Sequence, residues 1–203
     1  MRETNPRERG FTLLEMVLVV AILMILMGIA VVQSFGSLEG YQANSAQDIV
    51  VSQLRVARQL AISQRRYVTI TFNTASNPQS MTYQVQPRQG SGDPPVAAVT
   101  VTLPRQTQFL QEGVGDTPMG FGTCGGSNGI CIGSVGGGPA IMQFTSTGQF
   151  TDGTGVNTLN GTVFVGIPNQ KATARAVTIL GSTGRVRQYT YSLSSASTGA
   201  WTQ

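Results

Sequence analysis

The chain has 203 residues and a formal net charge of +4, and 11% of its residues are charged, against about 25% in an average soluble domain. This composition is typical of a β-rich domain outside the cytoplasm, and the small positive charge does not by itself indicate nucleic-acid binding. No histidine is present, which excludes Ser-His-Asp and Cys-His catalysis and imidazole metal sites, so we expect no enzyme, no metal and no cofactor.

The first predicted element is a membrane-spanning helix over residues 11–32. Its 22 residues would form about 33 Å of helix, which matches a hydrocarbon core of about 30 Å. The apolar stretch is longer than that of a cleaved secretory signal, so we expect a retained single-pass anchor. Arg2, Arg7 and Arg9 precede the span and no basic residue follows it before Arg55. This asymmetry predicts a cytoplasmic start and a domain on the periplasmic side of the inner membrane.

The stretch RGFTLLEMVLVVAI, which overlaps the start of this span, resembles the class III signal of type IV pilins and pseudopilins. In that signal a short basic leader ends in glycine and is followed by Phe, Thr, Leu, Leu, Glu and an apolar helix. The resemblance implies that residues 1–10 are a leader peptide and that Gly10 is its last residue. It also implies that Phe11 becomes an N-methylated terminus made by a prepilin peptidase, with Glu15 as the fifth residue of the mature chain.

A carboxylate inside a membrane span costs about 2.5–3.5 kcal/mol even on lenient insertion scales, so Glu15 needs an explanation. Phe11 lies four residues earlier, on the same helical face, and cleavage after Gly10 would place an ammonium group one turn away. Pairing with that amine, in the same or a neighbouring subunit, would offset the cost and fix a register between subunits. We therefore predict that Glu15 is an assembly residue. The alternative is a side chain that snorkels to the membrane edge without a partner.

Residues 33–65 predict an amphipathic stalk helix that continues the span outward. Gly36 and Gly40 lie between the two halves and mark where the helix bends most easily. Four arginines lie near the C-terminus of this stalk helix, where they complement the helix dipole and need no ligand: Arg55, Arg58, Arg65 and Arg66. The apolar stripe recurs at helical spacing, at Ala46, Ile49, Val50, Leu54, Ala57, Leu60 and Ala61.

After Arg66 the apolar period changes from 3.6 to 2, which predicts antiparallel strands with one buried face. The alternating runs are YVTITF, MTYQVQ and VTVTL, followed by AIMQFTSTGQF, GTVFVGI and ARAVTILGSTGRVRQYTYS. Residues 66–203 therefore form a β-rich domain, and the stripe of the stalk helix is the natural cover for its sheet. The predicted fold class is α+β, with a long N-terminal helix packed on an antiparallel β-sheet.

Three segments of this outer domain resemble the GspH/FimT family of minor pilins and pseudopilins: ARQLAISQRRYVTITF, FTSTGQF and AVTILGSTGRVRQY. The resemblance implies a pilin-like fold and a structural subunit of a type II secretion pseudopilus or a type IV pilus. The implied partners are other pilins, the prepilin peptidase, the inner-membrane assembly platform and membrane lipid. The anchor and the assembly charge are common to both machines, so these features do not separate them.

A Gly-rich insertion over residues 104–139 departs from this resemblance. It contains the two cysteines of the chain, Cys124 and Cys131, which lack the further ligands of a zinc site. We predict a surface loop pinned by a disulfide between them, and two unrelated thiols are the alternative. Gly120, Gly122 and Gly125 satisfy G-x-G-x-x-G, but no strand precedes them and no helix follows, so we treat the match as chance.

The stretch GSTGRVRQYTY contains the one candidate binding motif. Arg185 and Arg187 would extend from one side of a strand about 6.5–7 Å apart, close to the spacing of neighbouring phosphates. Tyr189 and Tyr191 would share that face and stack on bases, unless they pack inward. The resemblance to FimT-type minor pilins implies DNA capture by the Gly-Arg-x-Arg element that begins at Gly184. The alternative is a pair of arginines that keeps a sheet edge soluble.

Overall fold

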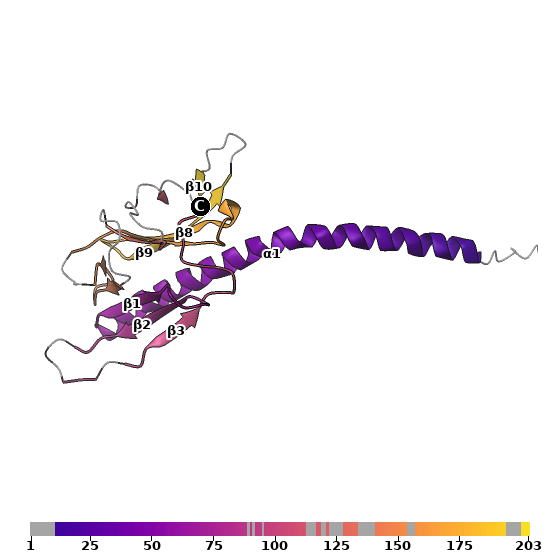
Figure 1. The fold of residues 1–203 in the computed structure, drawn as a ribbon. Helices are drawn as coiled ribbons and strands as arrows, with labels where there is room; N and C mark the ends of the chain where they lie inside the picture. The colour runs from indigo at the N-terminus through magenta and orange to yellow at the C-terminus, as the bar shows by residue number, and fades with distance from the viewer. Residues whose placement is uncertain are drawn as a thin grey trace, which may run out of the picture. The chain divides into compact units, whose positions relative to one another are not determined.

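The computed structural model describes residues 11–88, 90, 92–94, 96–112, 117–118, 121, 128–133, 141–153, 157–193 and 200–203, with the backbone alone over residues 30–37. The chain divides into two compact units, Met1–Leu38 and Glu39–Gln203. Helix α1 (Leu13–Gln64) begins in the first unit and ends in the second. Figure 1 shows the strands gathered around the second part of this helix.

The first unit contains the start of α1, and every side chain from Phe11 to Ile29 is exposed. Apart from Glu15 these residues carry no charge. None of the helical stretches that the structure describes combines the length and the apolar character that a bilayer crossing requires. The membrane span over residues 11–32 therefore stays a prediction.

The second part of α1 presents an apolar stripe to the core of the second unit. Six side chains at three- and four-residue spacing are completely buried: Ala43, Ala46, Val50, Leu54, Ala57 and Ala61. Five of them, from Ala46 to Ala61, belong to one cluster with residues of both β-sheets, such as Ile70 and Ile179. The helix ends at Gln64 because Arg65 takes a left-handed conformation (φ 51°), after which the Arg66 N–H donates to the Ala61 carbonyl at 3.1 Å. This packing confirms the predicted α+β fold with a long helix against antiparallel strands.

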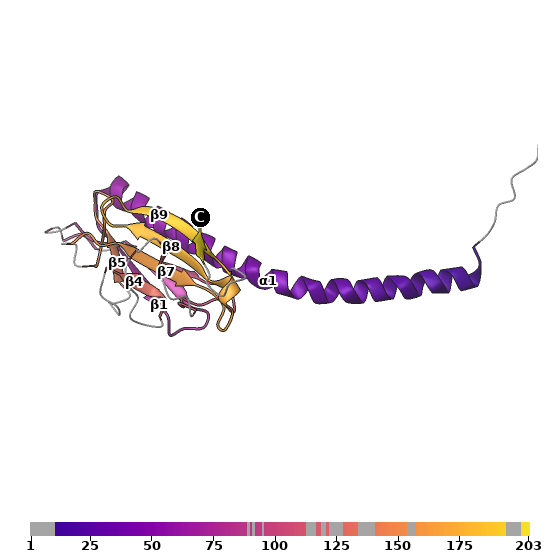
Figure 2. The same cartoon turned by 90° about the horizontal axis from the view of Figure 1, so that it is seen from above.

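The strands form two five-stranded antiparallel sheets rather than one. The first sheet has the order β3-β2-β1-β5-β6, and the second has the order β10-β9-β8-β7-β4. The strands of the first sheet are β1 (Val68–Asn73), β2 (Ser80–Val85), β3 (Val99–Thr102), β5 (Ile141–Phe144) and β6 (Phe150–Thr151). Those of the second sheet are β4 (Ile130–Ile132), β7 (Gly161–Val165), β8 (Arg175–Leu180), β9 (Arg185–Ser192) and β10 (Ala200–Thr202), and a short 3-10 helix, η2 (Lys171–Thr173), precedes β8. Figure 2 shows β7, β8 and β9 side by side with α1 behind them.

Strand β4 corrects the prediction for the Gly-rich insertion. Its three residues pair with β7 and are all buried, so residues 130–132 are not part of a surface loop. Phe109, at the other end of the insertion, is also buried and makes an edge contact with Phe72 at a ring-centroid distance of 5.1 Å. Three apolar residues between glycines are too short for a strand period to be recognised in the sequence.

Polar contacts fix α1 against the second sheet. Gln47 is buried, and its Nε2 donates to the carbonyls of Ala176 in β8 and Tyr189 in β9 at 3.0 and 2.9 Å. The buried guanidinium of Arg175 donates through Nε to Asn44 Oδ1 at 2.8 Å, and burial lowers the pKa of Arg175. Because an unmade buried hydrogen bond costs about 1–3 kcal/mol, these contacts hold one face of α1 beside β8 and β9.

Candidate functional site

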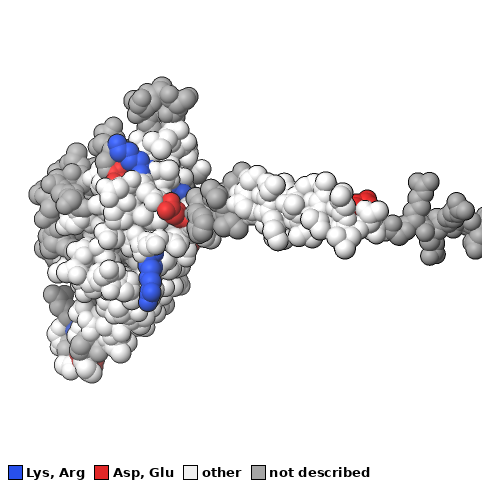
Figure 3. Space-filling view, turned by 45° about the vertical axis from the view of Figure 1, so that its right-hand side comes forward, with Lys and Arg blue, Asp and Glu red and all other residues white. Residues whose placement is uncertain are grey.

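The predicted processing and assembly residues lie at the start of the chain. Gly10 is outside the described residues. Phe11 is the first residue that the structure describes, and its side chain is 73% exposed. Glu15 lies in the first turn of α1 and is exposed in the single chain. Figure 3 shows one acidic group near the N-terminal end of an otherwise uncharged stretch of helix.

Thr12 gives this helix start a capping interaction that sequence analysis missed. The N–H of Glu15 donates to Thr12 Oγ1 at 3.3 Å, which satisfies one of the free donors of the first turn. A glutamate three residues after a threonine cap is also the pattern of a capping box, and this pattern was available in the sequence. The carboxylate of Glu15 further complements the positive end of the helix dipole.

The predicted disulfide falls partly outside the described residues. Cys131 lies in β4, is buried and forms a disulfide. Cys124, the other cysteine of the chain, is outside the described residues, so the pairing of the two stays a prediction. Cys131 packs in a small cluster on the outer face of the second sheet, together with Phe164 and Tyr189.

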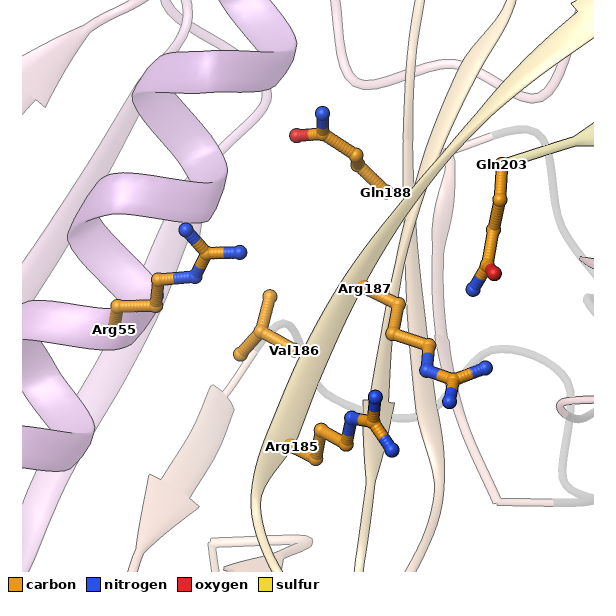
Figure 4. A pocket seen from close by; sticks show the side chains of 6 residues that line it. All are labelled: Arg55, Arg185, Val186, Arg187, Gln188 and Gln203. Atoms are coloured by element: carbon orange, nitrogen blue, oxygen red, sulfur yellow. The ribbon is translucent and has the colours of Figure 1, made fainter.

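The two candidate arginines extend from the same side of β9 (Figure 4). Arg185 is exposed and Arg187 is partly exposed, and between them Val186 points the opposite way, into the main core. Tyr189 shares the arginine face but is only 4% exposed. Tyr191 is half-buried against Trp201, at a ring-centroid distance of 5.2 Å. The tyrosines therefore pack in the outer cluster, and a stack of bases on Tyr189 is excluded by its burial.

The backbone conformation and close packing of Gly184 explain why a glycine precedes the two arginines. Its φ is +62°, and its N–H donates to the Leu180 carbonyl at 2.7 Å, which closes the turn between β8 and β9. A Cβ at this position would meet the Gly148 carbonyl oxygen and would lie 2.9 Å from Arg58 Nε. Arg58 Nε in turn donates to that same carbonyl at 3.3 Å. The turn therefore packs too closely on its neighbours for any side chain.

A third arginine joins Arg185 and Arg187. These two and Arg55 of α1 line an open pocket with a cavity volume of about 410 Å³. The other lining residues are Val186, Gln188 and Gln203. In Figure 4, Arg55 reaches toward β9 from the helix, on the side of the strand opposite to Arg185 and Arg187. The sequence predicts only a helix-dipole role for Arg55. No local signal marks it as a pocket residue, because only tertiary packing brings residues 55 and 185 together.

Comparison with known proteins gives one family match. Residues 5–31 match the family described as "Prokaryotic N-terminal methylation motif". No curated protein matches the chain. The match over residues 5–31 covers the second part of the basic segment, with Arg7 and Arg9, and most of the apolar helix predicted from the sequence.

Among solved structures the chain is similar to two crystal forms of the type IV minor pilin FimU of Pseudomonas aeruginosa strain PAO1. For one form the identity is 16%, the match covers 72% of this chain and 87% of FimU, and the TM-score is 0.43. For the other form the identity is 17%, the coverage is 71% and 90%, and the TM-score is 0.44. The family match over residues 5–31 confirms the prediction that this chain starts with a prepilin-type methylation motif.

Proposed function

We propose that the protein is a minor pilin or pseudopilin, a structural subunit that joins a filament through the first part of α1. The observation that carries this proposal is the methylation motif, which runs directly into a helix whose side chains from Phe11 to Ile29 are all exposed. So many exposed apolar side chains on a stretch of helix whose one charge is Glu15 need a cover. Before assembly the cover would be the lipid of the inner membrane, and in the filament it would be the equivalent helices of other pilins.

The proposed topology follows from the charges that flank the apolar segment. The leader would face the cytoplasm, the anchor would cross the inner membrane once, and the unit Glu39–Gln203 would lie in the periplasm. The prepilin peptidase and the assembly platform of a type II secretion system or a type IV pilus would be the partners at the membrane. The function of this subunit is assembly rather than catalysis, with Glu15 setting the stagger between neighbours.

The experiment that tests this proposal is mass spectrometry of the mature N-terminus from a host with an active prepilin peptidase. The expected terminus is Phe11 carrying one added methyl group, since the peptidase cuts after the leader glycine and methylates the new amine. A Gly10→Val chain is the matched control and should still begin at Met1. A wild-type chain that also begins at Met1 would rule out the proposed processing.

DNA binding through Arg185 and Arg187 is a second candidate function. The convergence of these residues with Arg55 on one pocket favours an anionic ligand. DNA would be held by phosphate contacts alone and not by base stacking, because Tyr189 is buried and Tyr191 packs on Trp201. The test is binding of the full chain to duplex DNA at low and moderate salt, because phosphate contacts weaken as salt rises. Wild-type binding by an Arg185→Ala, Arg187→Ala double variant would remove this candidate.

A further inference from the structure

Strand β9 has an edge that the described part of the chain leaves partly uncovered. Residues Arg185–Thr190 of this eight-residue strand pair with β8 on one side, whereas β10 on the other side pairs only with Thr190–Ser192. The pocket of Arg55, Arg185 and Arg187 lies along the part of β9 that β10 does not reach. An uncovered edge offers backbone donors and acceptors to another strand.

The alternation of backbone hydrogen bonds along β9 identifies which backbone groups face this edge. The Tyr191 N–H donates to the Ala174 carbonyl at 3.1 Å, so residue 191 directs its backbone groups toward β8. Successive residues of a strand direct these groups to alternate sides. Val186 and Gln188 therefore direct their N–H and C=O groups to the uncovered edge, and Thr190 and Ser192 direct theirs to β10. A strand that continued beyond β10 would meet two more residues in register.

The charged residues that the structure describes around this pocket are three arginines, which lie on both faces of the sheet. Arg185 and Arg187 extend from one face, and Arg55 approaches from the other (Figure 4). The remaining lining side chains in the described part of the chain are those of Val186, Gln188 and Gln203, so none of the described lining residues is acidic. Gln203 is held in place, since its Nε2 donates to the hydroxyl of Tyr189 at 3.1 Å.

We propose that this edge binds an extended acidic segment of another polypeptide, which adds to the second sheet as a strand beside residues 185–188 of β9. The side chains of an added strand alternate between the two faces of the sheet. Acidic side chains on one face would meet Arg185 and Arg187, and one on the opposite face would meet Arg55. Main-chain hydrogen bonds would give the register, and the arginines would select an acidic sequence.

The geometry favours a peptide over a nucleic acid as the occupant. The edge presents carbonyl acceptors as well as N–H donors at Val186 and Gln188, and a peptide backbone satisfies both, whereas a phosphate repels the carbonyls. The arginines lie on both faces of the sheet, which suits a ligand in the plane of the sheet with alternating side chains. Tyr189 is too buried to stack on a base.

The test uses the full chain in a neutral detergent and a fluorescein-labelled ten-residue peptide in which Thr or Val alternates with pairs of Glu. Fluorescence anisotropy should show saturable binding that weakens as salt rises. Arg55→Gln and Arg187→Gln should each weaken binding about threefold to tenfold, as expected for charge-assisted hydrogen bonds at a partly exposed site. Arg105→Gln is the matched control, because Arg105 is an exposed arginine outside the pocket, and it should bind as the wild type does.

A second peptide separates strand addition from simple charge attraction. It has the same sequence, with an N-methyl group on every backbone nitrogen, which blocks the N–H donors on both edges of the peptide and leaves the charge unchanged. We expect it to bind at least tenfold more weakly than the first peptide. Equal binding of the two peptides, or no binding of the first, would overturn the inference. It would also be overturned if a DNA oligonucleotide bound with the same arginine dependence and the acidic peptide did not displace it.

Discussion

A Glu15→Leu chain is expected to be processed normally but to lose its incorporation into filaments. The carboxylate is the one charge between Phe11 and Leu38. In the proposed assembly it pairs with the ammonium group of a mature Phe11, and removal of one partner of a buried pair costs about 3–5 kcal/mol. A loss of that size per contact corresponds to an affinity decrease of more than 100-fold. The measurement is the amount of the variant in purified filaments relative to its amount in the membrane.

Because Thr12 caps the first turn of α1, the Glu15 variant needs a control that removes the cap and keeps the Glu15 carboxylate. Thr12→Ala removes the side-chain acceptor that lies 3.3 Å from the Glu15 N–H, at a cost of about 1 kcal/mol to the first turn. We expect this variant to assemble nearly as the wild type does, because Glu15 remains. If Thr12→Ala failed to assemble as severely as Glu15→Leu, the order of the first turn would matter and not the carboxylate. Filaments containing wild-type amounts of Glu15→Leu would contradict the pairing directly.

The second part of α1 was the best-predicted part of the fold, because the sequence signals of a helix are local. The stripe from Ala46 to Ala61 repeats at helical spacing, and its smallest members are completely buried. The alternating runs also predicted most of the strands correctly. Their distribution over two sheets was not predictable, because alternation gives the two faces of a strand and not its neighbours. Strand β4, with three residues, was too short to give any period.

The candidate site shows the same division between local and tertiary information. The Arg-x-Arg spacing placed Arg185 and Arg187 on one side of a strand, since this follows from a period of two. The sequence could not show that Tyr189, two residues later on the same face, is covered by an outer cluster. It also could not show that Arg55 reaches the same pocket, because this depends on how α1 packs against β9.

Gly184→Ala is expected to destabilise the unit Glu39–Gln203 by about 2–5 kcal/mol. The left-handed backbone (φ +62°) costs an alanine about 1–2 kcal/mol, and overpacking against the Gly148 carbonyl adds about 1–3 kcal/mol. The neighbouring Arg58 Cδ would lie 3.0 Å from the new Cβ, and Arg58 is itself hydrogen-bonded to that carbonyl. For a chain of this size the Tm should fall by roughly 4–20 °C, measured by circular dichroism in a neutral detergent.

Gly40→Ala is the matched control for this glycine, because the same substitution should have the opposite sign. Gly40 lies inside α1, and no atom lies within 4 Å of a Cβ built on it. An alanine there should raise the stability by about 0.5–1 kcal/mol, since glycine loses more backbone entropy in a helix. An unchanged Tm for Gly184→Ala would mean that the turn between β8 and β9 relaxes freely. The glycine of the Gly-Arg-x-Arg element would then not be what holds Arg185 and Arg187 at the edge of β9.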